Sequence, residues 1–171
     1  MTVRGGLGDD VIWSNGGNNW LFGDAGDDKI VGAGGDDIIV GGADNDTLHG
    51  GGGEDTFCFG GKWGDDSIEQ CEGGISLLWF DGMTRDELSL DADTDGNAVL
   101  RSANGSVTLH GVKAAEVADA FNAGGNELAG SLTLKFGNDG TALYEELQMA
   151  SAFDAFTSER IFEEKEKGML A

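Results

Sequence analysis

The chain has 171 residues, with 31 glycines, no proline and a formal net charge of −22 from 10 basic and 32 acidic residues. This acidity argues against nucleic acid and anionic membrane surfaces as partners and favours cations. The length fits one domain, or one domain with a terminal appendage. The sequence has no run of about 20 apolar residues that would indicate a membrane-spanning helix.

Residues 1–4 lead directly into a repeat and do not have the pattern of a secretory signal peptide. Thr2-Val3-Arg4 fits the strand phase of a preceding repeat, with Val3 directed inward. We therefore expect the chain to be the C-terminal part of a larger protein.

Residues 5–58 consist of one nine-residue unit written six times without a gap, and a fixed internal period outweighs other sequence signals. The pattern is Gly-Gly-x-Gly-x-Asp-x-(large apolar)-x. The units are Gly5–Trp13, Ser14–Phe22, Gly23–Val31, Gly32–Val40, Gly41–His49 and Gly50–Cys58. The first half of each unit turns tightly on glycine. The second half is a three-residue strand whose middle side chain faces one side.

Two units make one coil, with a strand on each side and a turn at each end. The predicted fold is therefore all-β, a parallel β-roll. The apolar eighth positions should stack into a narrow core between two parallel sheets. These positions are Ile12, Leu21, Ile30, Ile39, Leu48 and Phe57.

The sixth positions place acidic side chains in the turns. Units two apart lie on the same side, and successive coils are about 4.8 Å apart. Carboxylates stacked this closely repel each other unless a cation lies between them. Oxygen ligands without His or Cys suit a hard cation, and Ca²⁺ tolerates irregular geometry best. One column holds Asp10, Asp28 and Asp46, and the other holds Asn19, Asp37 and Asp55.

This run resembles the RTX family of Gram-negative bacteria, whose nonapeptides read Gly-Gly-x-Gly-x-Asp. The resemblance implies a right-handed β-roll that binds one Ca²⁺ between each pair of same-side turns. It also implies that position six supplies carboxylate oxygen and that positions two and four supply carbonyl oxygen. The implied carbonyl positions include Gly6, Gly8, Asp24, Gly26, Gly35, Gly42, Asp44, Gly51 and Gly53.

Two repeats depart from the pattern. The second unit has Asn19 at position six and Asn15 at position two, so its site is expected to be the weakest or empty. Asp44 replaces a fourth-position glycine, and Asp is one of the few other residues that accept the left-handed region. A glycine-rich disordered linker is the alternative to the roll. We expect that description to hold for the calcium-free chain.

After Cys58 the phase slips by two residues, and a divergent seventh unit follows at 61–69. Asp66 falls at its sixth position and Ile68 at its eighth, so Asp66 should extend the first column. Trp63 is placed to cover the open end of the core. Counting same-side pairs of turns predicts about five ions. The pairs are Asp10/Asp28, Asp28/Asp46, Asp46/Asp66, Asn19/Asp37 and Asp37/Asp55.

One outer face of the roll is more apolar than the other, with Trp20, Phe22 and Ile38 directed outward. A patch of this kind indicates a contact surface. We expect the chain's own C-terminal part to pack there, with an upstream domain or a partner as the alternative. The cysteines, Cys58 and Cys71, are too few for a disulfide framework, and both a disulfide between them and two single thiols remain open.

Residues 70–112 are predicted to form a β-rich capping segment, like the region that follows RTX repeats. Its turn signals are Asp81-Gly82, Asp95-Gly96 and Asn104-Gly105. Asp91-x-Asp93-x-Asp95-Gly96 has the opening spacing of an EF-hand loop, but Ser102 stands where a bidentate Glu is needed. We therefore favour an acidic hairpin turn there. The predicted strands are Ile75–Phe80, Glu87–Asp91, Asn97–Ser102 and Ser106–His110.

Residues 113–171 are predicted to form a tail of helices and one strand. A short helix at 113–122 is followed by a strand at 131–136 and by a longer amphipathic helix or helix pair at 142–167. RTX proteins as a family leave the cell through a type I system that reads an uncleaved signal near the C-terminus. The tail has the right place for such a signal.

Neither His49 nor His110 lies in a metal or catalytic motif, so we expect no enzymatic activity within these residues. The sequence predicts a calcium-binding module that folds after type I secretion to the cell exterior or surface. Its partners would be calcium ions, the secretion machinery and an upstream domain of the same protein. The alternatives are the partner-binding end of a large adhesin and the tail of a secreted protease, lipase or polysaccharide-modifying enzyme.

Overall fold

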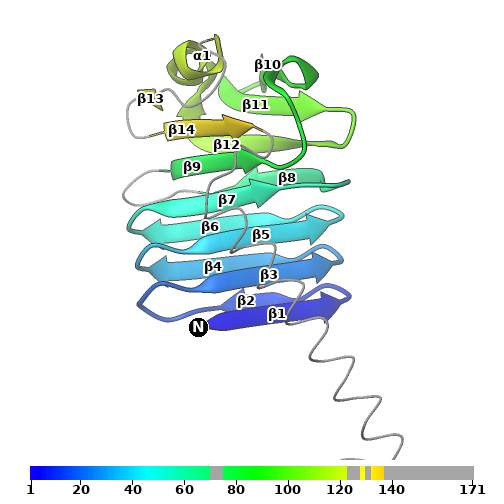
Figure 1. Cartoon of the computed structure of the whole chain (residues 1–171), viewed down its shortest axis with the longest axis vertical. Helices are drawn as coiled ribbons and strands as arrows, with labels where there is room; N and C mark the ends of the chain where they lie inside the picture. The colour runs from blue at the N-terminus through cyan, green and yellow to red at the C-terminus, as the bar shows by residue number, and fades with distance from the viewer. Residues whose placement is uncertain (70–74, 123–127, 130–131, 137–171) are drawn as a thin grey trace, which may run out of the picture. The chain divides into compact units, whose positions relative to one another are not determined.

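Two seven-stranded sheets face each other in the computed structural model, which describes residues 1–69, 75–122, 128–129 and 132–136 (Figure 1). One sheet contains β1 (Thr2–Leu7), β3 (Trp20–Ala25), β5 (Ile38–Ala43), β7 (Asp55–Phe59), β9 (Ile75–Phe80), β14 (Leu132–Phe136) and β13 (Leu128–Ala129) in that order. The other contains β2 (Val11–Trp13), β4 (Lys29–Gly34), β6 (Thr47–Gly52), β8 (Gly64–Ile68), β12 (Gly105–Lys113), β11 (Asn97–Ser102) and β10 (Ser89–Ala92).

The repeat strands alternate between the two sheets, so two nonapeptides make one coil, as predicted. The parallel register follows the period: Ile12 lies opposite Ile30, and Leu21 lies opposite Ile39, each two units further along. The two-residue slip after Cys58 is absorbed between β6 and β8, where Leu48 pairs with Ile68. The parallel β-roll predicted from the repeats is confirmed.

The eighth positions form the core of the roll. Ile12 is 6% exposed, and every later member of the series through Phe57 and Ile68 is fully buried. This stack continues into the capping residues, because Trp63, Leu78 and Phe80 belong to the same hydrophobic cluster. Trp63 packs with its ring centroid 5.9 Å from Phe59 and 6.1 Å from Phe80, so it covers the core of the repeats as predicted, and the core continues beyond it.

The sheets of the roll extend beyond the repeats. β9 pairs in parallel with β7, and β12 pairs in parallel with β8, so residues distant in sequence continue both stacks. The predicted hairpin between β11 and β12 is present at Asn104-Gly105, and β10 pairs antiparallel with β11.

The predicted hairpin at Asp81-Gly82 is wrong, because the chain crosses there from one sheet to the other. The predicted strand Glu87–Asp91 is replaced by a 3₁₀ turn, η1 (Arg85–Glu87), and by β10.

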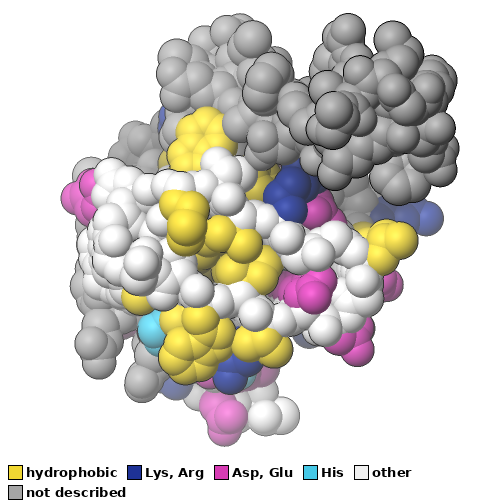
Figure 2. All heavy atoms as spheres, turned by 90° about the horizontal axis from the view of Figure 1, so that it is seen from below, with side chains coloured by type: hydrophobic (Ala, Val, Ile, Leu, Met, Phe, Trp, Pro, Cys, Tyr) yellow, Lys and Arg dark blue, Asp and Glu magenta, His cyan; other side chains and the backbone are white. Residues whose placement is uncertain are grey.

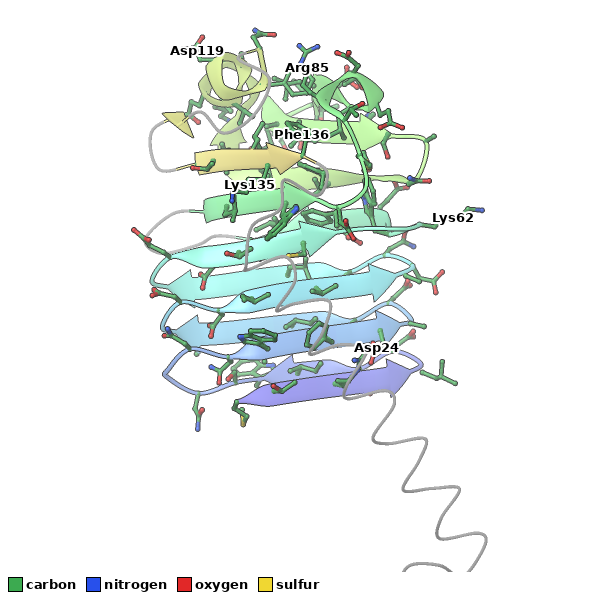
Figure 3. The ribbon with its side chains drawn as sticks, viewed as in Figure 1. Asp24, Lys62, Arg85, Asp119, Lys135 and Phe136 are labelled. Carbon is green, nitrogen blue, oxygen red and sulfur yellow. The ribbon has the colours of Figure 1, made fainter. Side chains whose placement is uncertain are left out.

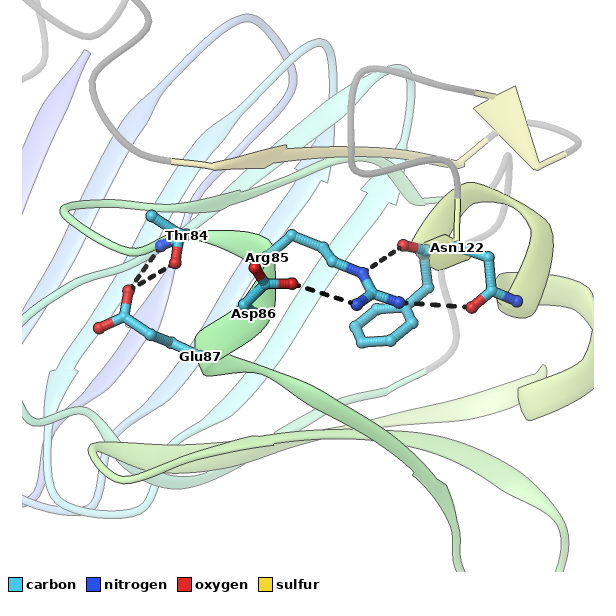
Figure 4. A network of polar contacts seen from close by, with 6 residues as sticks. Thr84, Arg85, Asp86, Glu87 and Asn122 are labelled. Carbon is cyan, nitrogen blue, oxygen red and sulfur yellow. Dashed lines mark hydrogen bonds and ion pairs between the residues drawn. The ribbon is translucent and has the colours of Figure 1, made fainter.

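A small polar network ties the turn η1 to the helix α1 (Ala114–Asn122), which matches the predicted short helix. Arg85 donates from Nε to the carbonyl oxygen of Phe121 at 3.0 Å, and its guanidinium lies 4.4 Å from the centroid of the Phe121 ring (Figure 4). The Glu87 carboxylate accepts from the backbone N–H of Thr84 at 2.7 Å. Val117 and Phe121 are buried in the common core, so the helix covers the end of the roll.

The outward side chains of the two sheets differ in burial. On the second sheet Val11 and Trp13 are 69% and 70% exposed, whereas Phe22 and Trp79 on the first are almost fully buried. Arg4 lies over the Phe22 ring, and Lys135, labelled in Figure 3, lies over the Trp79 ring at 5.4 Å. The predicted packing of the C-terminal helix at 142–167 on this face concerns residues outside those described and stays a prediction.

Apolar side chains are exposed at the N-terminal end of the roll, which Figure 2 shows from below. Met1 and Leu7 are 62% and 92% exposed. Among the described strands, β1 pairs only with β3, and β2 pairs only with β4. No helix in the described part of the chain is long and apolar enough to cross a membrane.

Three residues with a side chain adopt positive φ in the turns: Asp24, Ala33 and Asp44, at 80°, 77° and 79°. Asp44 therefore does occupy the left-handed region, and Asp24 is also paired with Arg4. Ala33 gains no such compensation from its methyl group. Holding a residue that has a Cβ in the left-handed region costs about 1–2 kcal/mol of folding free energy. Replacing that residue with glycine removes this cost but adds about 0.5–1 kcal/mol, because glycine loses more backbone entropy on folding.

We therefore expect Ala33→Gly to stabilise the folded roll by about 0.5–1 kcal/mol. Denaturant unfolding at saturating calcium measures this change. Ala43→Gly is the matched control, because Ala43 ends β5 without positive φ and should lose about that amount. Equal effects of the two substitutions would contradict the strain at Ala33.

Candidate metal sites in the turns

The sixth-position side chains form two buried columns along the roll. Asp28, Asp37, Asp46, Asp55 and Asp66 are each 3% exposed or less. The column order follows from the coil, since residues two units apart share a side. Asp66 of the divergent unit joins the column of Asp46, as predicted, because it accepts a hydrogen bond from that residue's backbone.

The preceding coil holds one carboxylate oxygen of every sixth-position aspartate after Asp10. The Oδ1 atom of Asp28 accepts from the backbone N–H of Asp10 at 2.8 Å, and that of Asp46 accepts from Asp28 at 2.9 Å. The second column repeats the arrangement from Asp37 to Asp55 at 3.0 Å. These bonds fix each side chain in one orientation and leave its second oxygen directed elsewhere.

The second oxygen has no partner. The Oδ2 atoms of all six sixth-position aspartates are buried without a hydrogen bond. An unpaired buried carboxylate oxygen is costly, and native proteins normally satisfy such an atom or place a cation against it. The six atoms are those of Asp10, Asp28, Asp37, Asp46, Asp55 and Asp66.

Backbone carbonyls crowd the same spaces. A Cβ built on Gly5 would lie 2.6 Å from Oδ2 of Asp10 and 2.8 Å from the carbonyl oxygen of Gly23 in the next coil. The same arrangement of a carboxylate and a carbonyl recurs at Gly23 and Gly32. First-position glycine is therefore required because oxygen atoms occupy the place of a side chain.

The carbonyls of positions two and four also point along the stack. The carbonyl oxygens of Gly8, Asp24, Gly35 and Asp44 each lie where a Cβ on the equivalent glycine of the next coil would be. Among the described residues, no three His, Cys, Asp or Glu side chains converge on one point. Any ion in these turns would therefore combine carboxylates with backbone carbonyls, which is the hard-oxygen ligand set that Ca²⁺ prefers.

Burial raises the pKa values of the carboxyl groups deeper in the columns, and the charge of a nearby aspartate adds to the effect. The pKa of Asp66 is raised to about 8, that of Asp46 to about 7 and that of Asp55 to about 6. Burial also raises the pKa of Asp28 and of Asp37. Without a cation, the folded roll thus disfavours its own ionised carboxylates.

The pH dependence of the calcium-free roll follows from these shifts. Between the unfolded pKa of about 3.9 and the raised folded values, the folded state binds more protons than the unfolded chain. Its stability is therefore greatest at acidic pH and is lost as pH rises toward about 8. We expect β-structure in excess chelator to decrease from pH 4 to pH 8, measured by circular dichroism.

The substitution Asp66→Asn should flatten the upper part of that pH profile, because it removes the group with the pKa of about 8. Asp65→Asn is the control, since Asp65 is exposed and its neighbour in the preceding coil is already an asparagine, Asn45. Identical profiles for the two variants would show that overall charge, and not the buried column, sets the pH dependence.

A second ladder at position five was missed by the sequence reasoning. Oδ1 of Asp9 accepts from the backbone N–H of Asp27 at 2.9 Å, and Oδ1 of Asp27 accepts from Asn45 at 2.9 Å. These bonds run in the opposite direction to those of position six. The signal was present in the sequence, because every unit has Asp, Asn or Glu at position five.

The EF-hand-like segment forms a hairpin turn and no helix flanks it. Asp93 accepts hydrogen bonds from the backbone of Asp95 and Asn97 at 2.9 and 2.8 Å. Asp91 lies 3.3 Å from Arg101. The carboxylate of Asp93 is therefore occupied within the turn between β10 and β11, which agrees with the predicted acidic hairpin turn.

Cys58 is a buried free thiol on the outer side of β7. Burial, together with the nearby charge of Asp81, raises its pKa to about 12. Such a thiol stays protonated and unreactive at neutral pH. Cys71 lies outside the described residues.

The comparisons with known proteins agree with this geometry. Residues 2–68 match the model of the RTX calcium-binding nonapeptide repeat (4 copies), through segments 2–30, 22–57 and 31–68. No curated protein sequence matches the chain. The fold and the buried aspartate columns define a calcium-binding β-roll. Residues 2–68 belong to the RTX calcium-binding nonapeptide repeat family.

The solved structures that resemble the chain include a lipase and part of an epimerase. The extracellular lipase LipA from Serratia marcescens is 27% identical, with a TM-score of 0.53 over 78% of this chain, and the chain spans only 20% of that lipase. A subunit of the mannuronan C5-epimerase from Azotobacter vinelandii is also 27% identical, with a TM-score of 0.51. That match covers 66% of this chain and 76% of the subunit.

Proposed function

We propose that the chain is a calcium-driven folding module of a larger exported bacterial protein. The observation that carries this proposal is the set of six buried, unpartnered Oδ2 atoms. With the net charge of −22, these atoms oppose folding unless cations neutralise them. Extracellular calcium modules bind with Kd values of about 10⁻⁴–10⁻³ M, so the roll would stay unfolded where calcium is scarce and fold outside the cell.

The proposed ligands are the sixth-position carboxylates, with carbonyl oxygens of positions two and four completing each site. The five same-side pairs of turns allow up to about five ions, and this count includes the pair Asn19/Asp37. When bound, Ca²⁺ supplies positive charge between the coils. The protein contributes the fixed Oδ2 atoms, which the backbone hydrogen bonds to Oδ1 of Asp28 and Asp46 already orient.

Export through a type I system belongs to the same proposal. An unfolded, calcium-free chain is suited to pass through a channel, and residues 113–171 are the proposed location of the secretion signal. The described part of this tail consists of α1, β13 and β14. The division into a roll at 1–69, a capping segment at 70–112 and this tail remains a proposal.

The larger protein is proposed to be a secreted enzyme whose catalytic residues lie outside this chain. The solved structures that resemble the roll include parts of two enzymes, a lipase and an epimerase. The partner-binding end of an adhesin is the alternative. An upstream catalytic domain in the full-length gene would support the enzyme, whereas long tandem repeats would support the adhesin.

Circular dichroism of the whole chain tests the calcium-driven folding. We expect an unfolded spectrum in excess chelator at pH 7.5 and a β-rich spectrum in millimolar Ca²⁺. Mg²⁺ should substitute poorly, because it demands near-octahedral geometry at about 2.0–2.1 Å. A β-rich spectrum that persists in chelator at this pH would overturn the proposal.

A further inference from the structure

The turn of the second repeat differs from all the other repeat turns in how its sixth-position side chain is satisfied. The Nδ2 group of Asn19 donates to the carbonyl oxygen of Asn15 at 3.1 Å and also to that of Gly17. It donates further to Oδ1 of Asp37 in the next coil at 3.1 Å. Asn19 is 3% exposed, so this network is shielded from water.

Two of the three acceptors are carbonyl oxygens of positions that are proposed to face an ion, because Asn15 and Gly17 are positions two and four of their unit. The third, Oδ1 of Asp37, also accepts from the backbone N–H of Asn19 at 2.8 Å. A carboxylate offers only acceptors, whereas an asparagine amide adds two N–H donors. The amide nitrogen therefore satisfies the two carbonyl oxygens that a cation would have to satisfy in the other turns.

The same repeat also departs from the pattern at its first position. Ser14 is the only residue other than glycine at a first position among the six regular units. Because asparagine and aspartate have the same shape, the turn that accommodates Ser14 together with Asn19 has room for a carboxylate at position 19. The difference between this turn and the others is therefore the hydrogen-bond donor of Asn19.

We infer that the turn pair Asn19/Asp37 is closed by the asparagine amide and takes no calcium ion. The inference rests on the proposed calcium function of the other turns. It predicts that Asn19→Asp, which replaces the N–H donor with a carboxylate oxygen of the same shape, creates a calcium site. Ser14→Gly with Asn19 retained should not create one.

Calcium bound per folded chain, measured by equilibrium dialysis with elemental analysis, tests the inference. We expect Asn19→Asp to bind one ion more than the natural chain, and Ser14→Gly alone to bind no additional ion. Equal binding by Asn19→Asp and the natural chain would overturn the inference, and so would a full additional ion in Ser14→Gly alone. If the natural chain binds no calcium, the proposed function fails first, and this outcome is distinct from both.

A readout on the natural chain does not depend on how the variants fold. In ¹⁵N-resolved NMR spectra of the calcium-loaded chain, the Asn19 side-chain NH₂ pair should exchange slowly with water, because both hydrogens are bonded and buried. Fast exchange of that pair in the folded protein would contradict the inference, since an amide turned with its oxygen toward an ion frees its N–H groups. Asn18, which is exposed at the neighbouring position, supplies the fast-exchanging reference.

Discussion

Truncation after Cys58 is expected to abolish calcium-induced folding, although all six regular repeats remain. A solenoid repeat contacts only its neighbours, so the last coil needs a cap. In the whole chain, β8 pairs in parallel with β6 and places Ile68 over Leu48. In the same way, β9 pairs with β7 and places Leu78 over Phe57. Re-exposing a large apolar side chain costs about 1.5–3 kcal/mol, and a core one residue wide has little stability to lose.

The truncation also removes Asp66, whose carboxylate completes the last turn pair with Asp46. We propose that folding starts at 50–68 and propagates toward residue 5. Deleting residues 1–22 is the matched comparison, because it removes two repeats from the uncapped end and leaves the cap in place. That variant should fold at nearly the calcium concentration of the whole chain.

A calcium titration followed by circular dichroism compares the three chains. If the repeats truncated after Cys58 fold at the same calcium concentration as the whole chain, the cap is not the nucleus. Failure of the chain lacking residues 1–22 to fold would place the nucleus at the N-terminal end instead.

Asp46→Asn is expected to remove at least one calcium ion and to raise the half-saturating calcium concentration at least about tenfold, which corresponds to about 1.4 kcal/mol. Asp46 contributes to two turn pairs, with Asp28 and with Asp66. The affinity of calcium sites depends on the number of charged ligands. In excess chelator the same substitution should have the opposite effect and stabilise the folded state at neutral pH. The reason is that it removes a buried carboxyl group whose pKa is raised to about 7.

Asp27→Asn provides the control for this prediction, because it makes the same chemical change one position away. Asp27 is exposed, and its Oδ1 accepts from the backbone N–H of Asn45 at 2.9 Å. Asn45 does the same for Asp65 in the next coil, so an asparagine serves equally well at position five. Isothermal titration calorimetry of both variants separates the buried column from general loss of negative charge. Equal weakening of calcium binding in the two would contradict the account.

The roll was predictable from the sequence because its determinants are local and periodic. Each nonapeptide specifies its own turn through glycine and its own strand through one apolar residue. The 18-residue separation of Ile12 and Ile30 then fixes the register without further information. The aspartate column followed from the same period, and Asp66 could be assigned despite the slip because Ile68 retained the eighth-position spacing.

The rest depended on pairing between residues distant in sequence. Nothing local in Ser106–His110 indicates that β12 pairs in parallel with β8, where Ser106 Oγ donates to Asp65 at 2.8 Å. Asp81-Gly82 has the composition of a hairpin turn, yet the strand before it already pairs within the roll. The amide network of Asn19 could not be predicted from the repeat pattern either. The pattern shows that asparagine replaces aspartate at position 19, but it does not show which atoms the amide contacts.

Anomalous X-ray scattering from crystals grown in calcium tests the central claim most directly, because it locates the ions themselves. We predict peaks between the turns of Asp10 and Asp28, Asp28 and Asp46, Asp46 and Asp66, and Asp37 and Asp55, each next to an Oδ2 atom that now lacks a partner. Peaks absent from these columns, or confined to the Asp91–Asp95 turn and the outer faces of the sheets, would contradict the claim that calcium between stacked turns holds the roll together.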